Sequence, residues 1–111
     1  MSSLSKTSFQ EMSFLDEMID QVIILDKSRN VCCANKSAFT RFGNDINGKN
    51  ISLILRDAKL LESIDLAINN KKTQIVDIEI KLPNFEFYKA NIIPGPSKLC
   101  NQDQSVMIFL K

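Results

Sequence analysis

The spacing of apolar residues changes twice along the chain. Residues 8–21, SFQEMSFLDEMIDQ, carry apolar side chains every three or four positions, which predicts an amphipathic helix. Residues 21–26 and 31–34, QVIILD and VCCA, are short apolar runs on either side of polar residues 27–30, and they predict a hairpin of buried strands. We expect residues 1–7 to be a disordered leader and residues 22–111 to form one folded core.

Helical spacing returns in the middle of the chain. Asn35 is expected to cap a helix that ends near Phe42, because an asparagine side chain accepts a hydrogen bond from the first turn and Gly43 provides a stop. Residues 51–70 predict a short helical piece and then a longer helix capped by Asp57.

A period of two replaces the helical spacing from residue 73. Residues 76–82 alternate apolar and charged side chains, which predicts a half-buried strand. Residues 85–93 are expected to return beside it, residues 94–104 to form a loop rich in turn formers, and residues 105–111 to form a last apolar strand.

This order of elements predicts an α+β domain, in which helices cover one face of a five-stranded antiparallel sheet. The apolar runs at 22–25 and 106–110 leave no polar face on their strands. The second face of the sheet therefore needs the N-terminal helix, a second copy of the chain, or both. The residues predicted for such a dimer interface are Phe9, Met12, Leu15, Ile19, Val22, Met107 and Phe109.

The stretch VIILDKSRNVCCANKSAFTRF, residues 22–42, resembles the opening of a PAS domain, and the resemblance extends over about residues 12–111. Such domains begin with a strand ending in Leu-Asp, a tight turn, a second strand and a capping asparagine. The matching residues here are Leu25 with Asp26, the turn 27–30, and Asn35. The turn glycine common in the family is absent, and Asn30 is expected to take its positive φ.

Residues 53–94 are similar to the cytoplasmic PAS domain of sensor histidine kinases of the phosphate-regulon sensor type. The resemblance implies a non-catalytic sensory and dimerisation module of a bacterial two-component kinase. It implies a homodimer, downstream kinase segments that carry the phosphorylated histidine, a response regulator, and a cytoplasmic location within a parent anchored in the inner membrane. This chain itself is not expected to be an enzyme.

Composition narrows these functions further. The 111 residues carry a net charge of +1 with interspersed signs, which gives no electrostatic footprint for nucleic acid or an anionic membrane. No apolar run reaches the roughly 20 residues of a membrane helix, and the first residues do not resemble a signal peptide. The chain has no histidine, so the usual haem ligand and the commonest general base are missing.

The three cysteines do not form an obvious site. An odd count without a secretory signal favours a reducing cytoplasm. Cys32 and Cys33 are adjacent on a strand and are expected to point to opposite faces, so they cannot share a metal and are interpreted as packing residues. A thiol redox sensor using Cys33 or Cys100 is retained as an alternative function.

The cofactor of a PAS domain is the remaining question. Flavin-binding members resemble one another by an Asn-Cys-Arg-Phe-Leu-Gln run that this chain lacks, and haem members generally use a histidine. No cofactor is predicted. A small organic ligand between the sheet and the helices of residues 35–68, as in a metabolite receptor, is the other alternative. Its expected lining is Phe39, Thr40, Phe42, Ile54, Arg56, Leu61 and Ile64, which are core residues if the cavity is filled.

Overall fold

The computed structural model describes residues 20–80, 85–97 and 102–111. Its elements are β1 (Gln21–Asp26), β2 (Val31–Ala34), α2 (Lys36–Phe42), the 3₁₀ helix η1 (Ile51–Leu53), α3 (Ala58–Asn70), β3 (Gln74–Ile80), β4 (Glu86–Ser97) and β5 (Gln102–Leu110). The predicted leader and most of the predicted helix 8–21 lie outside the described residues, and Gln21 begins β1.

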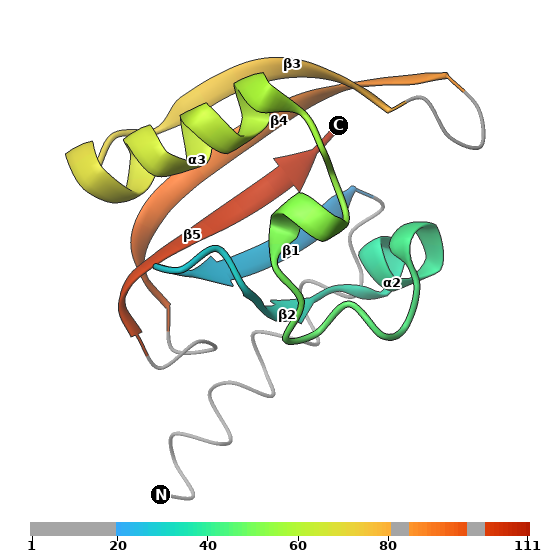
Figure 1. Ribbon diagram of the computed structural model, residues 1–111, viewed down its shortest axis with the longest axis horizontal. Helices are drawn as coiled ribbons and strands as arrows, with labels where there is room; N and C mark the ends of the chain where they lie inside the picture. Colours follow the sequence, from blue (N-terminus) through green and yellow to red (C-terminus); the bar gives the residue numbers. More distant parts are fainter. Residues whose placement is uncertain (1–19, 81–84, 98–101) are drawn as a thin grey trace, which may run out of the picture.

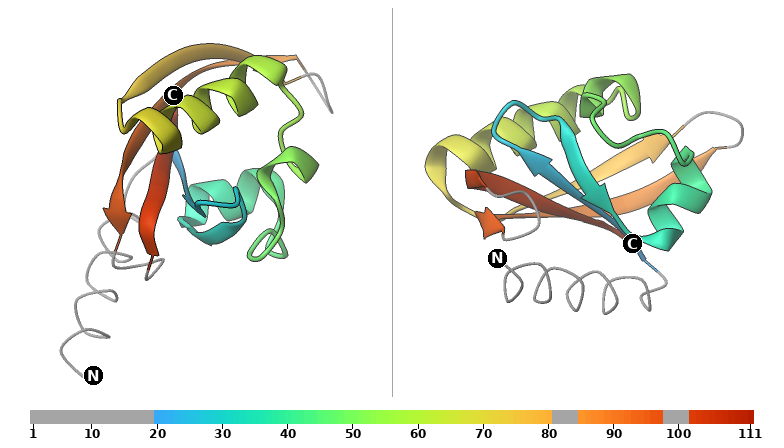
Figure 2. Two further views of the ribbon diagram at one scale, coloured as in Figure 1. Left: turned by 60° about the vertical axis from the view of Figure 1, so that its left-hand side comes forward. Right: turned by 90° about the horizontal axis from the view of Figure 1, so that it is seen from below.

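The five strands form one antiparallel sheet in the order β2-β1-β5-β4-β3 (Figure 1). The sheet is strongly curved, and α2 and α3 lie on its concave side (Figure 2). The first strand to follow the helices, β3, is therefore an edge strand, and the last, β5, is central. This architecture confirms the predicted α+β fold with helices over one face.

The hydrophobic core lies between the concave face and the helices. Helix α3 presents one stripe to it, and the stripe matches the predicted helical spacing because residues three and four apart share a face. The helix contacts β3, β4 and β5, while α2 contacts β1. The fully buried members of this core include Ile23, Leu25, Ile51, Leu60, Ile64, Ile92, Ile108 and Leu110.

The predicted loop at residues 94–104 is wrong at both ends. Strand β4 continues through Pro94 to Ser97, and β5 already begins at Gln102. A register shift between Gly95 and Ser97 interrupts the ladder there. Proline and glycine are tolerated in a strand at such a bulge, and the Ser105 hydroxyl donates a hydrogen bond to the Gly95 carbonyl.

A second bulge lies at the adjacent cysteines Cys32 and Cys33, and it contradicts the prediction that they point to opposite faces of the sheet. Ile24 pairs with Cys33 and Leu25 pairs with Val31, so Cys32 is an extra residue on β2. An extra residue shifts the alternation of side chains by one position. Both cysteines consequently pack against the same convex-face cluster, which is built on the buried Val22 and Ile24.

The turn between β1 and β2 also differs from the prediction in one residue. Asp26 Oδ1 accepts hydrogen bonds from Ser28 N at 2.8 Å and Asn30 N at 3.0 Å, so Asp26 organises the turn as expected. The positive φ, 70°, belongs to Arg29 and not to Asn30. Asn30 forms a bridge with Asn50, which requires extended backbone and moves the left-handed residue one position back.

Replacing Arg29 by glycine is expected to stabilise the domain by about 0.5 kcal/mol. Glycine removes a left-handed cost of roughly 1–2 kcal/mol, and its greater freedom in the unfolded chain offsets part of the gain. Lys71→Gly is the matched variant, because Lys71 has φ 54° at the C-cap of α3. Urea unfolding should show gains of similar size for both variants; a loss at Arg29 alone would mean that its side-chain contacts outweigh the backbone cost.

Candidate functional site

Asn35 joins the entry of the first strand to the first helix. Its side chain is fully buried. Its Oδ1 accepts hydrogen bonds from Val22 N and Ala38 N, both at 3.0 Å, and its Nδ2 donates to the Asp20 carbonyl at 2.9 Å. The predicted helix cap is confirmed, and the same side chain also fixes the backbone where β1 begins.

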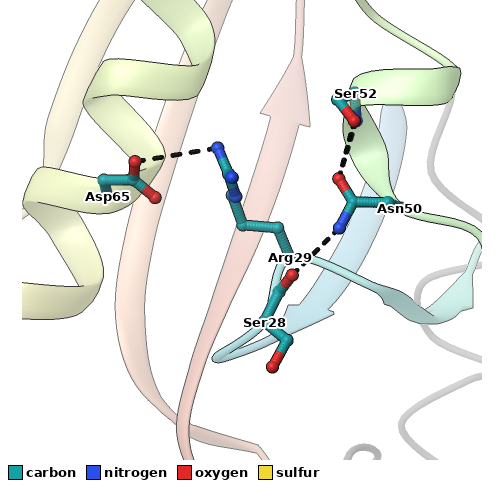
Figure 3. Close-up of polar contacts among 5 residues, drawn as sticks. All are labelled: Ser28, Arg29, Asn50, Ser52 and Asp65. Carbon is teal, nitrogen blue, oxygen red and sulfur yellow. Dashed lines mark hydrogen bonds and ion pairs between the residues drawn. The ribbon is translucent and has the colours of Figure 1, made fainter.

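A second polar cluster ties the β1–β2 turn to the segment after α2 (Figure 3). Asn50 Nδ2 donates to the Ser28 carbonyl at 3.0 Å, and Asn50 Oδ1 accepts from Ser52 N at 3.1 Å. An Arg29 guanidinium nitrogen lies 3.7 Å from Asp65 Oδ2 on α3. The turn is therefore tied both to the cap of η1 and to α3.

A third cluster connects α2 to the start of β4. Arg41 Nε donates to Glu86 Oε1 at 2.7 Å, and the Tyr88 hydroxyl donates to Glu86 Oε2 at 3.1 Å. The Arg41 guanidinium also lies 5.2 Å from the centre of the Phe42 ring, within cation–π range. Sequence reasoning did not predict this cluster, because no local pattern links residues 45 positions apart.

The variant Glu86→Gln is expected to lower the free energy of unfolding by about 0.5–1 kcal/mol, because it removes a charge-assisted hydrogen bond at a partly exposed site. Hydrogen exchange should accelerate in α2 more than in α3. Asp65→Asn is the matched control, since the Arg29–Asp65 pair is long and exposed. Equal effects of the two substitutions would show that the Arg41–Glu86 link does not hold α2 in place.

The residues predicted to line a ligand cavity fall into three environments. Ile64 is fully buried in the core. Thr40 and Arg56 are exposed. The other four pack against the core while partly buried, and they are Phe39, Phe42, Ile54 and Leu61. The cavity therefore stays a prediction, and Ile64 is placed as a core residue.

Two small grooves open beside these residues. One, of about 230 Å³, lies between Leu53–Asp57 and β3, and another, of about 300 Å³, lies between the last turn of α2 and η1. Leu53 and Ile54 border both grooves, so the end of η1 separates them. Lys49 lines the second groove, and its hydrogen bond to Asp45 at 2.8 Å lowers the pKa of that carboxyl.

A wider groove of about 730 Å³ runs between the first turn of α3 and the middle of β3 and β4. Charged side chains of both signs line it together with aromatic ones. Its residues were not predicted as a site, and they are Asp57, Ala58, Lys59, Asp77, Ile78, Glu79, Phe87, Tyr88 and Lys89.

The predicted dimer-interface residues are mostly covered within one chain or lie outside the described residues. Val22 is fully buried, and Met107 and Phe109 pack half-buried beside it. Phe9, Met12, Leu15 and Ile19 lie outside the described residues. Their role in dimerisation stays a prediction.

Cys32 and Gln21 have features that the sequence did not predict. Cys32 takes part in a disulfide bond, which revises its interpretation as a packing residue only.

The side-chain oxygen of Gln21 is buried and accepts no hydrogen bond from the described residues. A buried acceptor without a donor costs about 1–3 kcal/mol.

Comparison with known proteins defines the class of fold. No family model matches the chain, and no curated protein matches it. Solved structures do match. The PAS domain of an HTR-like protein from Haloarcula marismortui superposes with a TM-score of 0.70 at 13% identity, covering 99% of this chain and 94% of that one. The chain therefore has a PAS fold.

Two further structures place the similarity among sensor proteins. The PAS domain of nitrogen regulation protein NR(II) from Vibrio parahaemolyticus matches with a TM-score of 0.69 at 16% identity, covering 91% of this chain and 95% of that one. A sensory box sensor histidine kinase from Vibrio cholerae matches with a TM-score of 0.64 at 18% identity, covering 98% and 94%. Structural neighbours of this chain thus include PAS domains of sensor histidine kinases. Within the described residues, no helix is both long and apolar enough to span a bilayer.

Proposed function

We propose that this chain is a sensory and dimerisation module of a two-component sensor histidine kinase, and that it is not itself catalytic. The observation that carries the proposal is the PAS fold shared, over nearly the whole chain, with domains of such kinases. The absence of histidine supports the non-catalytic part, because the phosphorylated residue must then belong to another segment. The narrower resemblance to the phosphate-regulon sensor type, the bacterial cytoplasmic location and the response regulator remain parts of this proposal.

The contacts of the domain suggest how a shift could spread through it. Asn35 couples Asp20 to α2, and Glu86 couples α2 to β4. Strand β5 lies between β1 and β4, and its last residue, Leu110, pairs with Gln21. A displacement at the start of β1 would therefore reach the end of β5 along two routes. One passes through α2 and β4, and the other passes directly across the hydrogen bonds between β1 and β5. A two-state shift of this kind would bias the attached kinase segments.

A domain exchange tests the sensory role. Residues 1–111 replace the matching domain of the Vibrio cholerae sensor histidine kinase, and ATP-dependent autophosphorylation is measured beside the native protein and a version without that domain. We expect the chimera to differ from the deletion, and Asn35→Asp to change its rate, because the carboxylate keeps the acceptor and loses the donor to Asp20. A chimera indistinguishable from the deletion would contradict the role.

A metabolite receptor is a second candidate function, and the groove of about 230 Å³ beside Ile54 and Arg56, two of the residues predicted to line a ligand cavity, favours it. Native mass spectrometry of the purified chain tests for a retained small molecule. A ligand whose retention is lost on Arg56→Ala would support the receptor. A bare chain that gains no thermal stability from a metabolite library would count against it.

A thiol redox sensor is the third candidate, and the disulfide at Cys32 supports it. Oxidation of two thiols by hydrogen peroxide would form the disulfide and release two waters. Peptide mapping with and without dithiothreitol should identify the second thiol. If Cys32→Ser leaves the peroxide response of the chimera unchanged, redox sensing is excluded.

A further inference from the structure

The two edge strands of the sheet, β2 and β3, are protected to different extents. Strand β2 has four residues, and its Val31 exchanges backbone hydrogen bonds with Gly48 and Lys49 on its outer side. Strand β3 has seven residues, pairs with β4 without a register shift, and contains no proline or lysine. Bulges, proline and lysine are common means of protecting an edge strand. The edge of β3 is therefore the less protected of the two.

The hydrogen bonds of the next strands show which backbone groups of β3 point outward. Lys89 and Lys111 exchange two backbone hydrogen bonds of 3.1 Å, so the N–H and C=O groups of Lys89 point away from β3. Because Asp77 is opposite Lys89, its own N–H and C=O groups point away from β4. The same holds for Ile75 and Glu79, since these groups alternate in direction along a strand. No described residue forms a hydrogen bond with them.

Two grooves meet at this open edge. The groove of about 730 Å³ and the groove of about 230 Å³ share Asp57, Ile78 and Glu79. The larger one touches the first turn of α3 on the concave side and Glu79 on the convex side, so it passes around the edge of β3 (Figure 2). The two grooves join into one trough, which lies between residues 53–59 and residues 77–80.

The concave side of the trough is largely apolar. Leu53, Ile78 and Ile80 border it, and Leu53 is 68% exposed. A strand lying beside β3 would direct every second side chain to this side of the sheet. Apolar side chains at those positions would cover Leu53 and remove its surface from water, which is favourable.

The convex side of the trough carries the carboxylates of Asp77 and Glu79. Lys89 lies 3.5 Å from Asp77, whereas Glu79 is opposite Phe87 and forms no ion pair within the described part of the chain. Lys59, the other basic residue of the trough, belongs to the α3 wall. The alternate side chains of an added strand would lie next to the two carboxylates, where basic residues form favourable cross-strand pairs.

We infer that the open edge of β3 binds an extended segment of a partner protein in which basic and apolar residues alternate. The segment adds a further strand to the sheet, antiparallel to β3 like the pairs already present. Its basic residues lie opposite Asp77 and Glu79, and its apolar residues enter the concave side of the trough. Main-chain hydrogen bonds supply affinity in such strand addition, and the alternate side chains supply specificity. This role goes beyond the proposed sensory function and does not depend on it.

A second copy of β3 fits the same edge poorly. Antiparallel pairing of two β3 strands centred on Asp77 or Glu79 places each of these carboxylates opposite its own counterpart. Pairing centred on Ile78 places Asp77 opposite Glu79 twice. Like charges directly opposite each other are destabilising. The carboxylates that attract a basic segment therefore also hinder the edge from pairing with itself.

Titration with a defined peptide tests this inference. The probe is the acetylated and amidated peptide Val-Lys-Val-Lys-Val-Lys-Val, and its binding to the isotope-labelled chain is followed by NMR. We expect saturable binding that slows amide hydrogen exchange at Ile75, Asp77 and Glu79 at least about tenfold, because their N–H groups become hydrogen-bonded. The matched peptide with glutamate in place of lysine should bind at least about tenfold more weakly.

N-methylated peptides separate strand addition from attraction by charge alone. In the antiparallel arrangement, the lysine N–H groups point toward β3 and the valine N–H groups point away. Methylation of the lysine backbone nitrogens should therefore abolish binding, whereas methylation of the valine backbone nitrogens should keep the affinity within about threefold. Equal binding of the two methylated forms, or no binding of the unmodified peptide at millimolar concentration, would overturn the inference.

Glu79→Lys should weaken binding of the lysine peptide about tenfold. Glu62→Lys makes the same charge change at an exposed position of α3 outside the trough, and it should leave binding unchanged. Circular dichroism of each variant establishes that it is folded. Equal binding by the two variants would contradict the arrangement, as would slowed exchange at Asp77 in the concentrated chain without peptide, which would identify a second copy as the occupant. None of these results bears on the sensory role, which the domain exchange tests separately.

Discussion

Replacing Asn35 by alanine is expected to lower the free energy of unfolding by about 3 kcal/mol. The substitution removes a helix cap, usually about 1 kcal/mol, and leaves the buried Val22 amide without its acceptor at a cost of about 1–3 kcal/mol. It also frees the Asp20 carbonyl. Urea unfolding followed by circular dichroism measures the change.

Asn50→Ala is the matched control for this prediction. Asn50 also caps a helix, η1, through its side chain, but it is only partly buried. We expect a loss near 1 kcal/mol. If the two asparagines cost the same to remove, the buried link from Asn35 to the start of β1 contributes nothing beyond ordinary capping.

Ile64→Ala is expected to cost about 3–4 kcal/mol, because it removes a fully buried side chain between α3 and the sheet and leaves a cavity. Leu66→Ala, two positions along the same helix, is the matched control: Leu66 is 40% exposed, and its loss should be below 1 kcal/mol. Thermal and urea unfolding of both variants measure the difference.

The Ile64 substitution also separates a core residue from a ligand-lining residue. A core residue loses stability in proportion to the cavity that it leaves. If Ile64 instead borders a cavity that is already empty, fewer contacts are lost and the cost falls toward that of Leu66→Ala. A small cost at Ile64 would therefore revive the prediction that the helices cover a ligand.

Local chemistry made most of the fold predictable from the sequence. Asn35 and Asp57 each cap a helix by accepting a hydrogen bond from the amide three residues later, and such short-range geometry is visible in the residue order. The alternation along β3 is equally local. The Leu-Asp turn could be placed because Asp26 bonds to amides within four residues.

The errors came from interactions that sequence spacing does not determine. A strict alternation cannot indicate an inserted residue, so the bulge at Cys32 changed the predicted faces. Pro94 and Gly95 indicated a loop because their place in the ladder depends on pairing with Val106 and Ser105. The Arg41–Glu86 link and the trough beside the edge of β3 depend on tertiary arrangement for the same reason.

The pairing of Gln21 with Leu110 has a mechanical consequence. Strands β1 and β5 are antiparallel neighbours inside the sheet, so the first residue of one and the last residue of the other lie side by side at the same end of the sheet. A tension that separates these two ends would break the hydrogen bonds between β1 and β5 one after another, starting at the Gln21–Leu110 pair. A shear force along the strands would instead load all of these hydrogen bonds at once. Because Ile23 and Leu25 of β1 share the helix-covered core with Ile108 and Leu110 of β5, opening this seam would also separate the two halves of that core.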